Sequence, residues 1–323
     1  MLKIDHLSTS YKTIDGNVRV VNDLDFEIYD NEIFGIAGES GCGKTTLLKA
    51  LYDIVEFPLE IDSGRVILSG EKNGASFSYE SGKIRNTWWN NISYVPQAAQ
   101  SVLNPITRIK NQFLDSIPKQ DRNNETKEQT LKRVAKYLEE LDLSPELLEA
   151  FPFQLSGGMR QRVIIALATF MSPNVVLADE PTTALDVVVQ RGILMMLMRL
   201  QKQLKNTLVL VSHDMGVHYQ ITNRMGIMYS GSFVELGNTD DIFNDPIHPY
   251  TKMLISALPR VGDKSQKIGI PGRPPALTNP PTGCRFAPRC PNATESCRKY
   301  VPEFREVRPG RFAACHLLNK EVK

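Results

Sequence analysis

Residues 38–46 read Gly38-Glu39-Ser40-Gly41-Cys42-Gly43-Lys44-Thr45-Thr46, a complete match to the pattern G-x-x-x-x-G-K-[ST]. The match follows an apolar run, residues 33–37, and precedes a stretch with helical character, residues 47–51. Glycines remove the Cβ atoms that would keep a backbone away from phosphate oxygens, and the start of the following helix directs its positive end at the anion. The stretch therefore predicts a phosphate loop between a buried strand and a helix of an α/β fold.

The residues of this loop have separate tasks in binding Mg-ATP. Lys44 is placed to reach the β- and γ-phosphates, and the Thr45 hydroxyl is placed to bind the Mg²⁺ ion that bridges them. Backbone N–H groups supply the rest of the cradle. We expect the nucleotide to be bound by Ser40, Gly41, Cys42, Gly43, Lys44, Thr45 and Thr46.

The composition is that of a globular protein with a main domain and an appendage. The chain has 323 residues, of which 41% are hydrophobic and 23% are charged. A net charge of +2 creates no broad field for nucleic acid or acidic lipid, so we expect no nucleic-acid partner and a membrane association only through another protein. The first residues lack the apolar run of a secretory signal, and the most hydrophobic segment, residues 192–200, is too short to cross a bilayer.

The N-terminal residues 2–36 alternate apolar and polar positions around turn residues, which predicts an antiparallel strand pair leading into the buried strand before the loop. Tyr11 lies on this pair. Its ring could stack on adenine, with Arg19 and Val20 beside it, although an ordinary core or surface tyrosine is an equal alternative.

Further along the chain, Gln97 directly follows a predicted strand, residues 91–95. In ATPases of this class such a glutamine reaches the metal and the attacking water. Apolar residues with helical spacing then occupy 127–141, with charges between them. We interpret residues 98–160 as a helical insertion into the α/β core.

A second anion-binding surface is predicted where residues 155–162 read Leu155-Ser156-Gly157-Gly158-Met159-Arg160-Gln161-Arg162. Ser156 can cap the following helix, and the glycines expose N–H groups at its start. Two phosphate-binding helix starts so far apart in one chain favour a dimer.

Two later strands end in polar side chains that suit hydrolysis. The buried strand of residues 175–178 runs into Asp179, placed to hold the Mg²⁺ shell, and Glu180, placed to polarise the attacking water. Asp186 follows shortly afterwards. The strand of residues 208–211 leads to His213, which we expect near the γ-phosphate.

Together these motifs resemble, over residues 1–258, the nucleotide-binding subunit of ABC transporters. The resemblance implies a P-loop NTPase ABC-type α/β core with an antiparallel β subdomain and a helical subdomain. It also implies a head-to-tail ATP sandwich in which Ser156 and Gly158 of one subunit face the phosphate loop of another. Asp186 is expected among the nucleotide-binding residues. Glu180 would be the general base, His213 would contact the γ-phosphate and Tyr11 would stack on adenine. The implied partners are a second related ATPase subunit, two membrane-spanning permease subunits and, indirectly, an extracytoplasmic solute-binding protein, with this chain peripheral on the cytoplasmic face of the membrane.

A narrower resemblance covers residues 245–251, 270–275 and 284–290. These are similar to the C-terminal extension of dipeptide and oligopeptide importer ATPases, and of related nickel importers. It implies that the chain powers import of di- or oligopeptides, with nickel or another small solute as the alternative. An ATPase of DNA repair is disfavoured, because such proteins insert very long coiled coils where this chain has only 57 residues, between Gln97 and Leu155. An ATPase of translation is disfavoured, because such proteins resemble tandem duplications, whereas this chain has a single set of motifs. Residues 259–323 are expected to form a proline-rich linker and a small Cys-rich module.

Four cysteines, Cys284, Cys290, Cys297 and Cys315, fall within this C-terminal module. Their density in a short segment predicts a metal staple, but their spacings do not name the metal, so tetrahedral zinc and, less favourably, two disulfides stay open. The resemblance to peptide-importer ATPases implies a [4Fe–4S] cluster. It also identifies one departure, because Cys42 stands where many relatives carry a small hydroxyl residue, and we expect function to survive because the cradle uses backbone there.

Overall fold

The structure is a computed structural model that describes residues 1–72, 74–97, 102–118, 121, 125–258 and 269–320. The chain divides into two compact units. The first unit comprises Met1, Tyr29–Glu32 and Leu68–Leu210, and the second unit comprises Leu2–Ile28, Ile33–Ile67 and Val211–Lys323. The phosphate loop and His213 therefore belong to the second unit, whereas Gln97, Ser156 and Glu180 belong to the first.

The second unit contains the predicted antiparallel strand pair. Strand β1 (Leu2–Thr13) pairs with β2 (Gly16–Ile28) from Leu2 opposite Ile28 to Thr13 opposite Gly16, and β4 (Leu59–Lys72) lies on the other side of β1. Leu2, Ile4 and Leu7 are fully buried on β1. The alternation in the sequence thus places one face of this sheet against a core.

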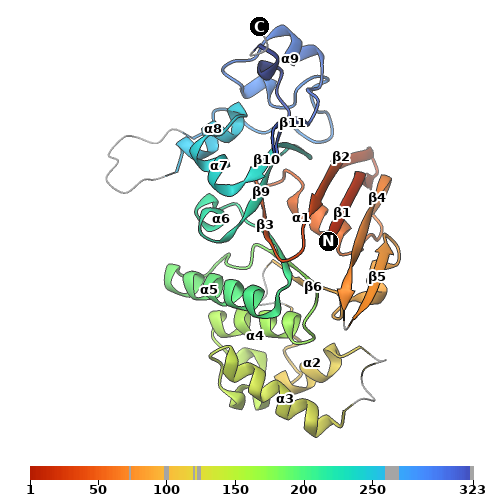
Figure 1. Cartoon of the computed structure of the whole chain (residues 1–323), viewed down its shortest axis with the longest axis vertical. Coiled ribbons are helices and arrows are strands. Elements are labelled where there is room, and N and C mark those ends of the chain that lie inside the picture. Colours follow the sequence, from red (N-terminus) through yellow and green to blue (C-terminus); the bar gives the residue numbers. More distant parts are fainter. Residues whose placement is uncertain (73, 98–101, 119–120, 122–124, 259–268, 321–323) are drawn as a thin grey trace. The chain divides into compact units, whose positions relative to one another are not determined.

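The larger sheet of the second unit is mixed. Its strand order is β11-β12-β10-β9-β3, and β3 pairs with β9 in parallel while the other pairs are antiparallel. The strands labelled in Figure 1 are β3 (Ile33–Ala37), β9 (Arg224–Tyr229), β10 (Ser232–Asn238) and β11 (Arg305–Arg308), and the fifth strand is β12 (Arg311–Ala313). The helices of this unit are α1 (Lys44–Leu51), α6 (Met215–Ile221), α7 (Thr239–Asn244), α8 (Pro249–Ser256) and α9 (Glu295–Lys299).

One apolar cluster joins the C-terminal residues to this sheet. Phe286, which is 1% exposed, packs with Ala37 at the end of β3, Tyr229 of β9 and Tyr250 of α8. Its ring meets Tyr229 edge-on with centroids 5.2 Å apart. The stretch after residue 269 therefore shares both a sheet and a core with the strand that precedes the phosphate loop. Residues 259–268, the first part of the predicted proline-rich linker and Cys-rich module (259–323), lie outside the described residues.

The first unit contains a parallel sheet and the helices of the predicted insertion. Its strand order is β8-β7-β6, and every residue of β7 and β8 is buried, as expected of parallel strands covered on both faces. The strands of this sheet are β6 (Ile92–Val95), β7 (Val175–Asp179) and β8 (Thr207–Val211), and a further strand, β5 (Ala75–Glu80), lies outside it. The helices are α2 (Ile109–Ser116), α3 (Lys127–Glu140), α4 (Gly157–Thr169) and α5 (Val187–Leu204).

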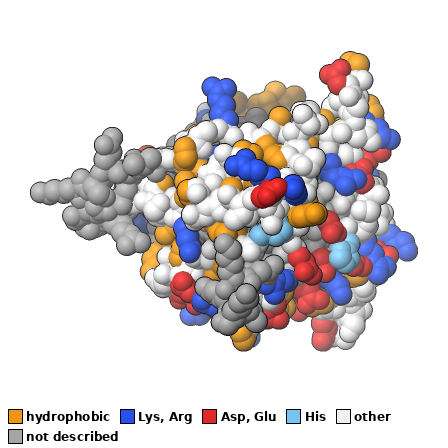
Figure 2. Space-filling view, turned by 90° about the horizontal axis from the view of Figure 1, so that it is seen from above, with side chains coloured by type: hydrophobic (Ala, Val, Ile, Leu, Met, Phe, Trp, Pro, Cys, Tyr) orange, Lys and Arg blue, Asp and Glu red, His pale blue; other side chains and the backbone are white. Residues whose placement is uncertain are grey.

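Helix α3 agrees with the periodicity seen at residues 127–141. It begins with a capping box in which Thr126 and Gln129 exchange side-chain and backbone hydrogen bonds. It contacts α2, and both helices lie within the predicted insertion, of which residues 98–101, 119–120 and 122–124 lie outside the described residues. In the part of the chain that the structure describes, no helix is both long and apolar enough to cross a membrane. Figure 2 shows Lys and Arg side chains interspersed with Asp and Glu on the face in view.

A buried ion pair anchors β12 to β10. The Arg311 guanidinium contacts the Glu235 carboxylate at 2.5 Å, with side chains 5% and 0% exposed. The same carboxylate accepts hydrogen bonds from the backbone N–H groups of Ile247 (2.8 Å) and His248 (2.9 Å). These donors compensate the cost of burying the charge and tie the start of α8 to the sheet.

Replacing Arg311 with methionine should lower the free energy of unfolding by about 3 kcal/mol, because removing one partner leaves a buried carboxylate without its counter-charge. The matched control is Arg308→Met on the neighbouring strand. Arg308 pairs with Asp245 where both side chains are more than half exposed, so its loss should cost less than about 1 kcal/mol. Urea unfolding measures both variants, and equal losses would contradict the assignment of Arg311 as the anchor.

Two fully buried histidines predict a loss of stability in mild acid. Burial lowers the pKa of His218 to about 4 and that of His248 to about 3, below the usual 6.5. Between pH 6.5 and about 4 the unfolded chain binds more protons than the folded chain, so stability is present above pH 6.5 and falls as the pH drops. Each histidine should contribute a slope of about 1.4 kcal/mol per pH unit in this window.

Denaturation of the wild type, His218→Gln and His248→Gln between pH 7 and 4 checks this expectation. Carboxylates titrate in all three proteins, so the difference from the wild type isolates each histidine. Identical slopes in the three proteins would refute it.

Candidate functional site

The phosphate loop is held close to strand β9 and to β2. Gly38 has φ +154°, and a Cβ at this position would lie 2.2 Å from the carbonyl oxygen of Met228. Gly43 has φ +108°, and its Cβ would lie 2.8 Å from the carbonyl oxygen of Val20. Both positions require glycine because of the close approach as well as the backbone conformation.

Lys44 places its ammonium group inside the loop. Its Nζ donates to the carbonyl oxygens of Gly38 (2.8 Å) and Glu39 (3.0 Å), and the residue is 6% exposed. No side chain caps α1, which begins at this lysine. The first-turn N–H groups and the ammonium group are thus arranged for an anion at the start of α1.

Cys42 fits the loop as a small apolar side chain. Its thiol is buried, and burial raises its pKa, so it stays protonated at neutral pH. The main chain of Cys42 carries the structural contact, because its carbonyl oxygen accepts from the N–H of Gly231 at 2.9 Å.

The strand pair β1–β2 carries Tyr11, Arg19 and Val20, the three residues predicted to lie beside adenine. The hydroxyl oxygens of Tyr11 and Thr46 lie 3.3 Å apart. Val20 is buried, with its carbonyl oxygen facing Gly43. Arg19 is more exposed and forms an ion pair with Asp62 at 3.7 Å. Tyr11 and Val20 therefore border the phosphate loop directly, and Arg19 lies on the neighbouring part of β2.

His213 follows β8 and is exposed, while Asp214 next to it caps α6 by accepting from the N–H of Gly216 at 2.8 Å. A second histidine, His218, supports this turn. Its Nε2 donates to the carbonyl oxygen of Ser212 at 3.1 Å, and its ring packs against Gly35 of β3. Sequence reasoning missed His218 because a single histidine within a helix carries no motif.

In the first unit, Gln97 and Glu180 come together at the ends of β6 and β7. The amide nitrogen of Gln97 donates to Oε2 of Glu180 at 3.3 Å, and the Thr183 hydroxyl donates to the same oxygen at 2.8 Å. Glu180 itself has φ +46°, a left-handed conformation that is uncommon for glutamate. Two donors thus hold one carboxylate oxygen of the predicted general base in a defined direction.

Asp179 precedes Glu180 and is fully buried. The Tyr94 hydroxyl of β6 donates to its Oδ2 at 3.0 Å. The parallel pairing of β6 with β7 puts these two side chains on adjacent strands. Neither Tyr94 nor Thr183 belongs to a motif, so neither was predicted. Their positions, three residues before Gln97 and three after Glu180, are the only signal that the sequence offers.

Ser156 and Asp186 both act as helix N-caps. The Ser156 hydroxyl accepts from the N–H of Met159 at 3.2 Å at the start of α4, and Asp186 accepts from the N–H of Val189 at 2.9 Å at the start of α5. A Cβ at Gly158 would lie 2.7 Å from Val189. Gly158 therefore lets the starts of α4 and α5 pack together.

Comparisons with known proteins identify the families that this chain resembles. Residues 21–183 match the sequence model of the family described as ABC transporter, and residues 234–297 match that described as oligopeptide/dipeptide transporter, C-terminal region. The dipeptide transport ATP-binding protein DppD of Caldanaerobacter subterraneus subsp. tengcongensis is 38% identical, over 98% of this chain and 97% of its own. The oligopeptide transport ATP-binding protein OppD of Escherichia coli (strain K12) is 36% identical, over 98% and 92%.

A solved structure confirms the predicted fold of the core. The dimeric bacterial ABC transporter cassette MJ0796 superposes with a TM-score of 0.60 at 25% identity, covering 74% of this chain and 99% of that cassette. The predicted P-loop α/β core with an antiparallel β part and helices is therefore correct.

The prediction of an iron-sulfur cluster is wrong. The relatives are named simply as transport ATP-binding proteins. Among the described residues, three or more metal-binding side chains come within 4.8 Å of one another only at Asp5, His6 and Asp25, and not at the cysteines. Burial raises the pKa of Cys284 to about 11 and also raises the pKa of Cys290 and Cys315.

Three of the C-terminal cysteines pack as small, mostly buried side chains. Cys284 and Cys290 pack against the cluster around Phe286, and Cys297, which is 6% exposed, is held by its backbone to Cys284 at 2.8 Å. All five cysteines are free thiols, so the disulfide alternative is not realised either.

Two family models match this chain, over residues 21–183 and 234–297. The first match includes the phosphate loop, the capped glycine-rich helix, and Asp179 and Glu180. The relatives match at more than a third of positions over nearly the whole chain. The chain belongs to the ABC transporter family, as an ATP-binding protein.

Proposed function

We propose that this chain hydrolyses Mg-ATP and thereby powers the import of dipeptides or oligopeptides through partner membrane subunits. The observation that carries hydrolysis is the Glu180 carboxylate, held by Gln97 and Thr183 directly after the buried Asp179. The substrate class is supported by the relatives, which are named for dipeptide and oligopeptide transport, and by the match of residues 234–297.

The roles of the residues follow from their chemistry. Glu180 removes a proton from the attacking water, while one of its oxygens remains fixed by Gln97 and Thr183. Lys44 neutralises the phosphates. The oxygen-bearing side chains Thr45, Gln97 and Asp179 are of the type that Mg²⁺ prefers, and when bound the ion neutralises charge on the phosphates.

The remaining predicted contacts concern the nucleotide and a second subunit. We assign Tyr11 to adenine, with Arg19 and Val20 beside it, and His213 to the γ-phosphate. Ser156, Gly158 and Asp186 are assigned to the ATP held by the other subunit of a head-to-tail dimer. Support comes from the N-terminal position of Ser156 and Gly158 in α4, where backbone N–H groups favour an anion.

We further propose the partners and the domain division expected from the sequence. The chain works with a related ATPase subunit, two permease subunits and an extracytoplasmic solute-binding protein, and lies at the cytoplasmic face of the membrane. Residues 1–258 form the ATPase domain and 259–323 the C-terminal part. The chromosome and DNA-repair alternative is disfavoured further, because α3 has 14 residues rather than the length of a coiled-coil arm.

The helical insertion is the proposed permease dock, with Gln97 at its hinge. Among its described residues the large, apolar and exposed side chains include Ile106 at 84% and Phe153 at 69%. A cavity of about 340 Å³ nearby is lined by Trp89, Tyr94 and Leu103 among other residues. Tyr94 also donates to Asp179, so a group inserted into this cavity would touch a residue bonded to the catalytic strand.

Replacing Glu180 with glutamine should lower ATP turnover of the assembled transporter by about 10²- to 10⁴-fold, because the amide cannot accept the proton. Nucleotide affinity of the same variant should stay within about twofold, which separates chemistry from binding. Near wild-type hydrolysis would refute the role of Glu180.

A photo-crosslinking amino acid at position 106 should capture a permease subunit in the assembled transporter, because Ile106 is exposed on the insertion. The matched control is the same amino acid at position 300, since Tyr300 is also exposed (64%) but lies near α9. Mass spectrometry identifies the products. Permease crosslinks from position 300 and none from position 106 would contradict the proposed dock.

A further inference from the structure

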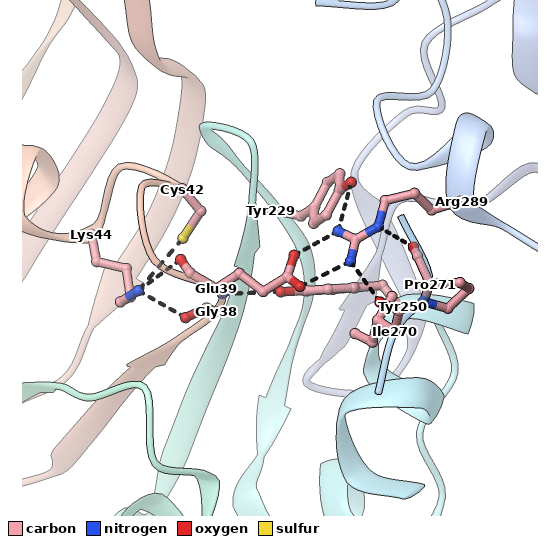
Figure 3. A network of polar contacts seen from close by, with 9 residues as sticks. All are labelled: Gly38, Glu39, Cys42, Lys44, Tyr229, Tyr250, Ile270, Pro271 and Arg289. Atoms are coloured by element: carbon pink, nitrogen blue, oxygen red, sulfur yellow. Dashed lines mark hydrogen bonds and ion pairs between the residues drawn. The ribbon is translucent and has the colours of Figure 1, made fainter. Parts of the chain in front are cut away.

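The C-terminal stretch reaches the phosphate loop through one side chain, Arg289. This arginine ends a short 3₁₀ helix, residues 287–289, and its side chain is 4% exposed. Its Nη1 contacts Oε2 of Glu39 at 2.6 Å and its Nη2 contacts Oε1 at 2.9 Å (Figure 3). The pair is therefore bidentate, the strongest and most directional form of an arginine–carboxylate contact. Glu39 is the second residue of the phosphate loop.

The remaining donors of Arg289 fix the orientation of its guanidinium group. Nε donates to the carbonyl oxygen of Pro271 at 2.8 Å, and Nη2 donates to that of Ile270 at 3.3 Å. Nη1 also donates to the Tyr229 hydroxyl at 3.3 Å. The group is thus held by the C-terminal stretch on one side and presented to the loop on the other.

Glu39 is held at its backbone as well as at its side chain. Its N–H donates to the hydroxyl of the buried Tyr250 at 3.0 Å, and its carbonyl oxygen accepts from Nζ of Lys44 at 3.0 Å (Figure 3). The residue that binds Arg289 through its side chain therefore also supplies, through its backbone, an acceptor for the phosphate-binding lysine.

The charge of Glu39 gives this contact a consequence for the nucleotide. A carboxylate in a loop that binds a polyphosphate repels it, and this repulsion is strong where the surroundings are partly buried. Arg289 supplies the compensating positive charge and directs the carboxylate toward the C-terminal stretch. It also fixes the loop before binding, so that less conformational freedom is lost when ATP binds.

The ion pair between Arg289 and Glu39 does more than anchor the C-terminal stretch to the second unit. Arg311 and Glu235 form another ion pair within the second unit, with side chains 5% and 0% exposed against 4% and 27% for Arg289 and Glu39. This pair holds β12 and the start of α8. The hydrogen bonds of Arg311 go to Glu235 and Asp245, which lie outside residues 38–46. By contrast, both oxygens of the Glu39 side chain bind Arg289. The two pairs therefore separate the stability of the stretch from its action on the loop.

We propose that Arg289 is a positioning residue for nucleotide binding, and that residues 270–290 set the ATP affinity of the phosphate loop by neutralising and orienting Glu39. This inference rests on the proposed role of the loop in ATP binding. Any partner or ligand that displaces residues 270–290 would lower ATP affinity without touching the nucleotide.

The test measures binding of a fluorescent ATP analogue with Mg²⁺ to the full chain. Arg289→Met should raise the Kd about tenfold, and in the assembled transporter it should raise KM for ATP while kcat at saturating ATP changes less than about twofold. Arg289→Lys retains the charge but not the bidentate geometry, so it should raise the Kd by about threefold. The lysine variant keeps the test available if the methionine variant does not fold.

The matched control is Arg311→Met, which should destabilise the chain while leaving the Kd within about twofold of the wild type. A double-mutant cycle with Glu39→Gln adds a readout that a merely structural role would not move. In the Glu39→Gln background, Arg289→Met should change the Kd by less than about twofold.

Two results would overturn the proposal: folded Arg289→Met that binds ATP like the wild type, or Arg311→Met that weakens binding as much as Arg289→Met. Lys44→Ala distinguishes this failure from failure of the proposed function. If the wild type binds the analogue and Lys44→Ala does not, the loop is the ATP site and only the role of Arg289 is at issue. If both bind equally, the proposed ATP site itself is wrong.

Discussion

The close approach of the phosphate loop to its own backbone neighbours is the constraint on which the second unit depends. Gly38 lies against the carbonyl oxygen of Met228, and Gly43 lies against that of Val20, at distances that no Cβ atom could tolerate. The loop is thereby fixed to β9 on one side and β2 on the other. Because it is fixed, Lys44 and the start of α1 hold an arrangement suited to phosphate in the absence of nucleotide.

In the first unit, neighbouring side chains orient two carboxylates, those of Asp179 and Glu180. Asp179 is buried at the end of a strand and Glu180 follows in a left-handed conformation. Tyr94 and Thr183 each donate a hydroxyl hydrogen bond to one of them. Each carboxylate therefore has one oxygen held in a fixed direction, which is how neighbours without a catalytic motif contribute to a site.

The C-terminal stretch is part of the second unit's sheet and core rather than an attachment to its surface. Strand β12 extends the sheet from β10, and Phe286 packs on Tyr229 and Tyr250. The hydroxyl oxygen of Tyr250 accepts a hydrogen bond from the Glu39 N–H. The cysteines of this stretch take part in the same packing, which explains their burial without a metal ion.

Much of the chemistry was predictable from the sequence alone, and the physical reason is that it depends on local order. The phosphate loop, the N-cap Ser156, the carboxylates after a buried strand and the helix at 127–141 are all defined by neighbours within a few residues, so periodicity and motif spacing suffice. Contacts between distant residues required the tertiary structure. Arg289 and Glu39 are 250 positions apart, and no spacing predicts that they meet. The same limit explains the error at the cysteines, because their density in the sequence does not report the distances between their sulfur atoms among the described residues.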